Sequence, residues 1–206
     1  MTKDTKAHWE TVYQTKSPDQ VSWTQEYPEL AINYLTDLNL PKDAAIIDIG
    51  GGEAAFAEAA MDLGYTNISV LDISEAALAN AKNRLGAKSE ALKWIISDIL
   101  SFEATEKYEF WYDRAVFHFL TKKEDIEKYK SVVTKSLADK SDFLLGTFSE
   151  NGPFKCSGLE ITQYSEKSMK DAFAENFVAQ NCFTQEHKTP FDTIQNFQFC
   201  GFKKLK

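Results

Sequence analysis

From position 44 onward, short apolar runs alternate with segments in which apolar residues recur at helical spacing. The apolar runs are continuous, which is typical of strands covered on both faces. Strands that alternate with helices in this way predict βαβ units and a parallel sheet. The predicted strands are Ala44–Ile49, Ile68–Asp72, Leu92–Asp98, Glu109–Asp113 and Phe143–Phe148.

Helices are predicted before, between and after these strands, where apolar residues fall on one helical stripe. Ser74 is a suitable N-cap for the third helix, and Gly86 is a suitable stop. Thr121 and Glu124 have the spacing of a capping box at the start of the fourth helix. The predicted helices are Pro28–Leu38, Glu53–Leu63, Glu75–Leu85, Lys122–Leu137 and Glu166–Phe173.

The C-terminal part of the chain has a different pattern. Two strand-like runs, Phe177–Phe183 and Ile194–Phe202, are joined by a short polar link around Pro190. Phe197, Gln198 and Phe199 alternate with period two, which favours an antiparallel hairpin over another crossover. We therefore predict an α/β, Rossmann-like three-layer sandwich with a mostly parallel seven-stranded sheet and a C-terminal antiparallel hairpin.

The N-terminal segment carries aromatic residues among polar ones. Trp9, Tyr13, Trp23 and Tyr27 all precede the first predicted strand. We expect residues 1–40 to form a helical cap over a pocket in a Rossmann-like core of residues 41–206. A chain of 206 residues with 43% hydrophobic content is long enough for one such domain, so we predict a single domain over 1–206.

Composition narrows the class of protein. No apolar run reaches the roughly 20 residues that span a membrane, and the charged start of the chain does not resemble a secretory signal. Cys156, Cys182 and Cys200 are widely spaced without a CxxC pair, which favours a reducing cytoplasm and argues against a disulfide framework or a metal site. The net charge of −8 disfavours nucleic-acid binding in general, although a structured RNA or a basic protein stays possible as a substrate.

The strongest chemical signal is the turn Gly50-Gly51-Gly52, which lies between an apolar strand and a helical pattern. Glycine lets a ligand approach the backbone closely, and the helix start adds free N–H groups and partial positive charge. The pattern Gly50-x-Gly52-x-x-Ala55, with Asp72 about 20 residues further on, fits the fingerprint of dinucleotide binding. An NAD(P)-dependent oxidoreductase of Rossmann type is therefore one hypothesis.

Two acidic residues, and the absence of a second nucleotide-binding half, favour a ligand other than a dinucleotide. Asp48 lies just before the glycines, where a carboxylate would repel a pyrophosphate and attract a cationic ligand. Asp98 ends the third predicted strand, where it could accept from the amino group of adenine. The chain also lacks a second mononucleotide-binding half, and Tyr164 and Lys167 miss the Tyr-x-x-x-Lys spacing of a hydride-transfer site.

These features resemble the class I S-adenosylmethionine-dependent methyltransferase family over most of the chain. Residues Asp48–Ala54 look like the first family motif, D-x-G-x-G-x-G, with Ala54 in place of the last glycine. Leu71–Ser74 resembles the second motif, whose acid binds both ribose hydroxyls, and Ser97–Ile99 is similar to the adenine-binding third. The glycine pair usual before the fifth strand is absent, with Ala138–Ser141 in its place.

Other segments resemble a small bacterial subgroup of that family. Asp113–Phe119 is similar to the subgroup's DRAVFHF motif, and His8–Tyr13 with Val21–Trp23 resembles its HWxxxY…VSW start. Gly152–Leu159 and His187–Pro190 look like its later signatures.

The resemblance implies S-adenosylmethionine as the cofactor. The methyl acceptor is a small molecule or a protein: the short chain without an added substrate domain favours a small molecule, and the acidic surface leaves methylation of a basic protein open. No metal site is expected. Catalytic candidates lie at the end of the fourth strand: Asp113, Arg114 and His118. A non-catalytic module that keeps the pocket for sensing is a third class of function. The expected cofactor-binding residues are Tyr13, Trp23, Asp48, Gly50, Gly51, Gly52, Asp72, Ile73, Asp98, Ile99 and Asp113.

Overall fold

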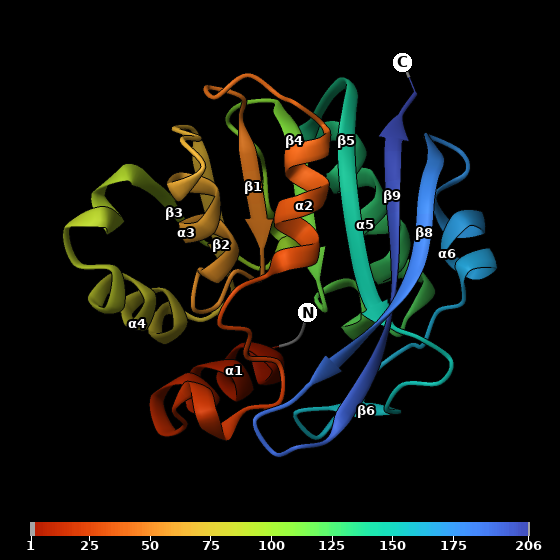
Figure 1. The fold of residues 1–206 in the computed structure, drawn as a ribbon. Coiled ribbons are helices and arrows are strands. Elements are labelled where there is room, and N and C mark those ends of the chain that lie inside the picture. Colours follow the sequence, from red (N-terminus) through yellow and green to blue (C-terminus); the bar gives the residue numbers. More distant parts are fainter. Residues whose placement is uncertain (1–2, 206) are drawn as a thin grey trace.

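The computed structural model of the protein, which describes residues 3–205, contains a seven-stranded sheet with the order β3-β2-β1-β4-β5-β9-β8 (Figure 1). The pairs from β3 to β5 are parallel, and β9 runs antiparallel to both β5 and β8. This confirms the predicted fold class. The strands are β1 (Ile46–Ile49), β2 (Ile68–Asp72), β3 (Leu92–Ile96), β4 (Tyr108–Arg114), β5 (Leu137–Phe148), β8 (Phe177–Lys188) and β9 (Ile194–Lys204).

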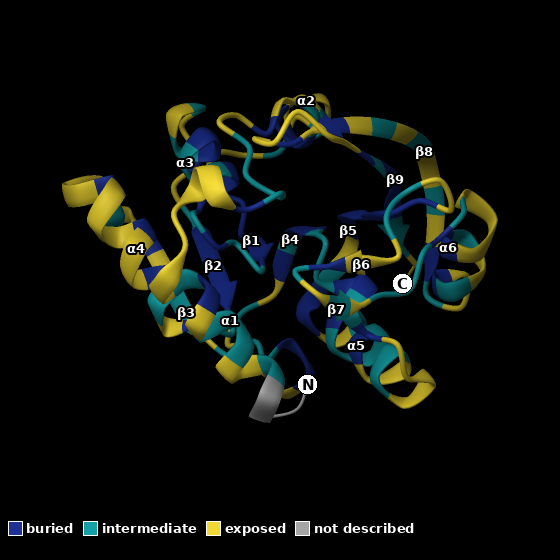
Figure 2. Ribbon diagram, turned by 90° about the horizontal axis from the view of Figure 1, so that it is seen from below, coloured by how far each residue is buried: buried dark blue, intermediate teal, exposed yellow. Residues whose placement is uncertain are grey.

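Helices cover both faces of the sheet and form the outer layers. One core cluster joins the sheet to α2 (Glu29–Asp37), α3 (Ala55–Asp62) and α4 (Glu75–Leu85). A second cluster, on the opposite face, joins it to α5 (Lys123–Ser136) and α6 (Glu166–Phe173). Figure 2 shows the buried strands in the centre with partly exposed helices around them. Burial on both faces explains why the parallel strands are continuously apolar in sequence.

The structure tests the predicted N-terminal caps of two helices. The backbone N–H of Ala77 donates to the Ser74 hydroxyl at 3.1 Å, and α4 ends at Leu85 before Gly86, both as predicted. The capping box at Thr121 is wrong, because α5 has Lys122 as its N-cap without a side-chain cap bond. Glu124 and Asp125 in the first turn instead place negative charge near the positive helix end.

Strand β5 starts at Leu137, six residues before the predicted start at Phe143. The register against β4 shifts between Tyr108 and Phe110, so residues 138–141 form an irregular stretch in which Asp139, Lys140 and Ser141 are polar. Lys140 has φ 57° there. A lysine thus takes a left-handed conformation in the stretch where the family is expected to carry its glycine pair.

The C-terminal hairpin overturns the prediction made for the cysteines, because Cys182 and Cys200 form a disulfide. The register of β8 against β9 shifts by one residue between Ala179 and Cys182. Without this bulge Asn181 would lie opposite Cys200, so the pairing depends on strand register, which the cysteine spacing does not reveal. Since disulfides are rare in cytosolic proteins, the cysteines give no support to a reducing compartment.

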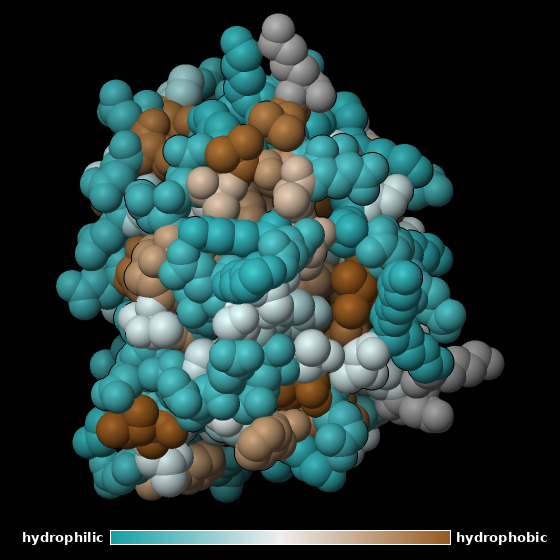
Figure 3. Space-filling view, turned by 90° about the vertical axis from the view of Figure 1, so that its right-hand side faces the viewer, coloured by the Kyte–Doolittle hydropathy of each residue, from teal (hydrophilic) through white to brown (hydrophobic). Residues whose placement is uncertain are grey.

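The outer edge of the sheet is formed by β8, most of whose residues are partly or fully exposed. Figure 3, which views the side where β8 and α6 lie, shows a mainly hydrophilic surface with separate hydrophobic spots. An edge strand of this kind offers no continuous apolar stripe for pairing with another chain. In the described range 3–205, no helix has the length and apolar character needed to cross a bilayer.

The N-terminal segment lies at the end of the sheet toward which β1 points (Figure 1). It contains α1 (Lys3–Thr15) and a short 3-10 helix, η1 (Pro18–Gln20). The carboxylate of Glu10 accepts from the Ser74 hydroxyl at 2.8 Å and from the Ala76 N–H at 3.1 Å. These bonds fix α1 to the start of α4, where a negative charge is stabilised by the helix dipole.

We predict that the disulfide stabilises the hairpin. Closing a loop of 18 residues is worth about 3 kcal/mol in the chain-entropy model. Cys182→Ser should therefore lower the free energy of unfolding by about that amount without reductant, measured by urea denaturation. Reductant should lower the stability of the wild type and of Cys156→Ser equally and leave Cys182→Ser unchanged. A wild type that is insensitive to reductant would contradict the pairing.

Candidate active site

A cavity lies where β1, β2 and β4 end, at the point where the strand order reverses between β1 and β4. Ligands of open α/β sheets bind at such switch points. The walls are the glycine turn, the ends of β2 and β4, and the N-terminal segment. The lining residues are Trp9, Tyr13, Trp23, Thr24, Gln25, Pro28, Asp48, Ile49, Gly50, Gly51, Gly52, Glu53, Ala55, Phe56, Leu71, Asp72, Ile73, Ser97, Ile99, Tyr112, Arg114, Ala115, Val116, Phe119 and Cys156.

The glycine turn has a left-handed backbone at alternate positions. Gly50, Gly52 and Ala54 have φ values of 64°, 51° and 58°. A Cβ on Gly50 would lie 2.2 Å from Val116 Cγ2, and one on Gly52 would lie 2.6 Å from the Tyr13 hydroxyl. The turn therefore needs glycine at both positions for conformation and for space. Ala54 adopts the same conformation where the family motif has its last glycine.

Asp72 holds this turn against β2. Its carboxylate accepts from the backbone N–H of Gly52 at 3.0 Å and from that of Ser74 at 2.8 Å. Burial raises the pKa of Asp72 to about 6, although these backbone N–H groups favour the charged form. A carboxylate has about four acceptor positions, so Asp72 keeps capacity for ligand hydroxyls on the side that faces the cavity.

Asp48 is a second buried carboxylate in the cavity wall, at the end of β1. Burial, with the nearby charges of Asp72 and Asp113, raises the pKa of Asp48 to about 8. Among the described residues, no ion pair joins a cation to Asp48 or Asp72. A cationic ligand in the cavity would favour the ionised form of both groups.

Asp113 belongs to the predicted site but does not line the cavity. One carboxylate oxygen accepts from the N–H of Val116 at 2.9 Å and of Phe117 at 3.4 Å, and the other accepts from the Tyr129 hydroxyl at 2.5 Å. Burial raises the pKa of Asp113 to about 7. The structure thus gives Asp113 a supporting role, in which it fixes the loop after β4 that carries Ala115 and Val116.

Asp98 also lies outside the cavity lining. Its carboxylate accepts from the Leu100 N–H at 2.9 Å and caps the 3-10 helix η3 (Ile99–Ser101). The neighbouring Ser97 and Ile99 line the cavity, as does Ile73 at the end of β2. Ile73 and Ile99 therefore offer apolar walls in the region where the resemblance implies an adenine.

His118 is buried in the 3-10 helix η4 (Phe117–Phe119) and does not line the cavity. The Phe148 N–H donates to its Nδ1 at 3.3 Å, and its Nε2 is buried without a partner among the described residues. Burial and the charge of Arg114 lower the pKa of His118 to about 3. A neutral imidazole behind the wall is a poor general base for a group inside the cavity.

Arg114, the third catalytic candidate, does line the cavity. Its Nη1 donates to the Trp23 carbonyl oxygen at 2.9 Å, and its guanidinium lies 4.5 Å above the Phe197 ring. Its Nη2 is buried and makes no hydrogen bond within the described chain. Arg114 therefore joins the cap to the sheet and also presents positive charge to the cavity.

The N-terminal segment closes the cavity with aromatic side chains. Trp9 lies 5.4 Å from Trp23 and 5.3 Å from Phe119 between ring centroids, in edge-to-face arrangements. On one side of α1 the Asn80 side chain donates to the Tyr13 carbonyl at 2.8 Å, and on the other His8 Nε2 lies 3.1 Å from the Ser157 hydroxyl. The cap is thus attached to both sides of the site. Ser157 belongs to the turn between β6 (Lys155–Cys156) and β7 (Leu159–Glu160).

Several lining residues were not predicted as site residues from the sequence. Trp9, Tyr112, Phe119 and Cys156 reach the cavity from four different segments. The periodicity of α1 could have indicated Trp9, because it lies four positions before Tyr13 and thus on the same helical face. Cys156 carries no such signal. Burial raises the pKa of its thiol to about 12, so it is protonated near neutral pH.

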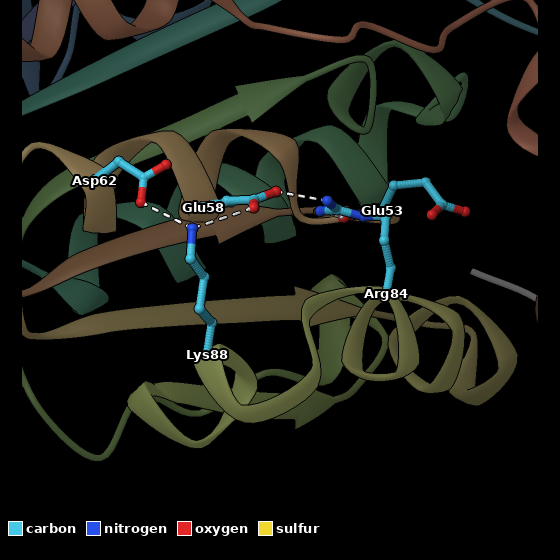
Figure 4. A network of polar contacts seen from close by, with 5 residues as sticks. All are labelled: Glu53, Glu58, Asp62, Arg84 and Lys88. Carbon is cyan, nitrogen blue, oxygen red and sulfur yellow. Dashed lines mark hydrogen bonds and ion pairs between the residues drawn. The ribbon is translucent and has the colours of Figure 1, made fainter.

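A surface network supports the glycine turn from outside (Figure 4). Arg84 on α4 donates to the Glu53 carbonyl at 2.8 Å and pairs with Glu58 on α3 at 2.5 Å. Lys88 pairs with Asp62 at 3.0 Å. Exposed ion pairs contribute little individually, so the network's main consequence is that it joins α4 to the turn and to α3.

The residues present fit a nucleoside with positive charge and no phosphate. Glycines leave room at the backbone, Asp72 and Asp48 are acceptors without cation partners, and Ile73 and Ile99 are apolar. A pyrophosphate at the glycine turn would meet the acidic side chains of Asp48 and Asp72. Within residues 3–205, no cluster of three His, Cys, Asp or Glu side chains could hold a metal ion.

Comparison with known proteins agrees with this geometry. Residues 46–139 match the model of a methyltransferase domain. The malonyl-[acyl-carrier protein] O-methyltransferase 2 of Ilyobacter polytropus is 32% identical over 82 residues, which are 39% of this chain and 31% of that protein. The chain therefore matches less than a third of the length of that relative.

Solved structures share the whole architecture. The N-methyltransferase NodS from Bradyrhizobium japonicum, in complex with S-adenosyl-L-homocysteine, has a TM-score of 0.73 at 16% identity and covers 96% of this chain and 98% of its own. The 1,6-didemethyltoxoflavin-N1-methyltransferase of Burkholderia thailandensis has a TM-score of 0.75 at 14% identity, with 98% and 88% covered. The match to a methyltransferase domain over residues 46–139 and the shared fold agree with the predicted resemblance, and neither favours the oxidoreductase alternative.

We predict that the burial of Asp48 makes stability fall with pH. Between its ordinary pKa near 3.8 and the raised value of about 8, folded Asp48 holds a proton that the unfolded chain releases. The free energy of unfolding of the cofactor-free protein should thus fall between pH 5 and pH 8, by roughly 1 kcal/mol per pH unit from this group.

The test is urea denaturation of the wild type and Asp48→Asn at several pH values. The variant should have the shallower pH dependence, because it has no proton to lose. Asp62→Asn, at an exposed carboxylate on α3, is the matched control and should keep the wild-type slope. Equal slopes for the wild type and Asp48→Asn would contradict the prediction.

Proposed function

We propose that the protein is a methyltransferase that transfers the methyl group of S-adenosylmethionine to a small-molecule acceptor. The observation that carries the proposal is the pair of buried acids, Asp48 and Asp72, around a glycine turn, which no cation in the described part of the chain pairs with. This combination suits a cationic nucleoside and opposes a pyrophosphate. The neighbours that carry S-adenosylhomocysteine support the same cofactor for this chain.

Each part of the cofactor has a matching group in the wall. Asp72 would accept hydrogen bonds from the ribose hydroxyls, and Asp48 would face the positively charged amino-acid part. Gly50, Gly52 and the first N–H groups of α3 would approach the amino-acid carboxylate. Ile73 and Ile99 would enclose the adenine, beside Asp98 at the edge.

The cofactor supplies an activated methyl group on a sulfonium. The protein has to hold the acceptor atom in line with the bond that breaks and to exclude water, and positioning of this kind provides much of the acceleration. Trp9, Trp23 and Phe119 contact one another in the cavity wall and supply apolar contact for an acceptor. The electron-rich faces of Tyr13 and Trp23 would stabilise the sulfonium.

The lining carboxylates Asp48, Glu53 and Asp72 belong to the glycine-turn side of the cavity, and within residues 3–205 the aromatic side proposed for the acceptor offers no general base. His118 and Asp113 lie behind the wall, the Cys156 thiol is protonated, and burial raises the pKa of the lining Tyr112 above its usual value. An acceptor that is already nucleophilic, such as a thiolate or a neutral amine, therefore suits this site better than an alcohol that must lose a proton.

A small acceptor is supported by the closed form of the site. The cap is attached to α4 by Glu10 and to the β6–β7 turn by His8, so a protein side chain would have to enter past both contacts. The Burkholderia thailandensis neighbour was solved with a small-molecule acceptor, 1,6-didemethyltoxoflavin, together with S-adenosylhomocysteine.

The class of acceptor is tested by measuring the release of S-adenosylhomocysteine over a panel of metabolite and protein acceptors. We expect turnover with small molecules. Turnover with proteins alone would overturn this part of the proposal.

The identity of the cofactor is tested by calorimetric titration of the protein with S-adenosylhomocysteine and, separately, with NADH. We expect binding of S-adenosylhomocysteine and no binding of NADH. Asp72→Ala should weaken the binding by about tenfold or more, because hydrogen bonds to a charged acceptor are lost. Asp62→Ala, an exposed aspartate on the neighbouring helix, should bind as the wild type does. Binding of NADH in place of S-adenosylhomocysteine would refute the proposal, and unchanged affinity in Asp72→Ala would refute the role of that residue.

A further inference from the structure

Arg114 is one of only two arginines in the chain, and no carboxylate within the described residues 3–205 pairs with it. The other, Arg84, is exposed and pairs with Glu58. Arg114 is partly buried in the cavity wall, and its Nη2 is fully buried without an acceptor within residues 3–205. A cation in such a place is costly unless an anion compensates it.

The groups nearest to Arg114 do not supply that anion. The Trp23 carbonyl and the Phe197 ring each offer only partial negative charge. The Cys156 thiol and the Tyr112 hydroxyl lie close by, but burial raises the pKa of both, so they are neutral near pH 7. The side chain is therefore positively charged, lines the cavity, and has one nitrogen that no group among the described residues satisfies.

The position of Arg114 separates it from the cofactor half of the cavity. It ends β4 and contacts Trp23 of the cap, whereas Asp48 and Asp72 end β1 and β2 beside the glycine turn. Trp9, Trp23 and Phe119, the wall proposed above for the acceptor, lie on the same side as Arg114. The cavity thus has buried acids at the ends of β1 and β2 and a guanidinium with aromatic rings where β4 meets the cap.

From this arrangement we infer that the methyl acceptor carries a carboxylate that binds Arg114, and that its apolar body lies against Trp9, Trp23 and Phe119. A guanidinium matches the planar, bidentate geometry of a carboxylate. A monoanion also balances the single charge of Arg114, while a dianionic phosphate would add negative charge to a site that already contains Asp48 and Asp72. This inference rests on the proposed function and specifies the class of its acceptor.

The probes are matched pairs that differ only in charge: 3-mercaptobenzoate, 3-aminobenzoate and 3-hydroxybenzoate, each with its carboxamide. Binding is measured by calorimetry and by quenching of tryptophan fluorescence, in protein saturated with S-adenosylhomocysteine and in cofactor-free protein. At least one acid should bind about tenfold or more tightly than its amide, because a charge-assisted hydrogen bond is lost in the amide. Equal binding of all acids and amides, or no binding of any acid, would overturn the inference.

Variants identify the residue responsible. Arg114→Met should reduce the preference for the acid to about twofold or less, and Arg114→Lys should keep part of it, because lysine retains the charge without the planar fork. Arg84→Met is the matched control at the other arginine and should keep the full preference. Persistence of the preference in Arg114→Met would overturn the inference.

Binding of S-adenosylhomocysteine separates this inference from the proposed function. The cofactor affinity of Arg114→Met should stay within about threefold of the wild type, because Arg114 lies outside the cofactor half; this also shows that the variant is folded. If the variant does not fold, the comparison of acids with amides in Arg114→Lys decides. If the wild type does not bind S-adenosylhomocysteine, the proposed function fails, whereas the acid preference of the cofactor-free protein is still measured independently.

Discussion

The bond between the Asp72 carboxylate and the Gly52 N–H is the contact on which the site depends. It ties a turn with a left-handed backbone at Gly50, Gly52 and Ala54 to the end of β2. The same carboxylate accepts from Ser74 at the start of α4. One buried acid therefore positions the glycine turn and the cap of the next helix. Burial of this acid raises its pKa, and a ligand that supplies positive charge or hydroxyl donors would offset the cost.

The charged groups of the cavity are arranged around this turn. Asp48 and Asp72 place two buried acids beside the glycine turn, where a cationic ligand would favour their ionised form, and Arg114 places positive charge where β4 meets the cap. The N-terminal cap joins these two regions, because Glu10 binds the start of α4 while the Trp23 carbonyl binds Arg114. A substrate and cofactor that carry opposite charges at the matching positions would be oriented before any chemistry takes place.

Much of this arrangement could be predicted from the sequence, and the failures have physical reasons. Continuous apolar runs revealed the parallel strands because both faces are buried, and acids that end parallel strands meet at one edge of the sheet. The disulfide was missed because one bulged residue in β8 brings Cys182 opposite Cys200. Asp113 and His118 were expected at the cavity, but sequence does not tell whether a side chain at the end of a strand points forward or folds back to backbone N–H groups. Phe119 and Cys156 line the cavity because packing positions the segments that carry them, and no local sequence pattern indicates that packing.

The central claim is that the carboxylates around the glycine turn hold a nucleoside with positive charge and no phosphate. A crystal structure of the protein grown with S-adenosylhomocysteine tests it most directly. We expect ribose hydroxyls within hydrogen-bond distance of Asp72, the amino-acid part beside Gly50 and Gly52, and the sulfur atom facing Trp9 and Trp23. A ligand bound elsewhere, or a ribose turned away from Asp72, would contradict it.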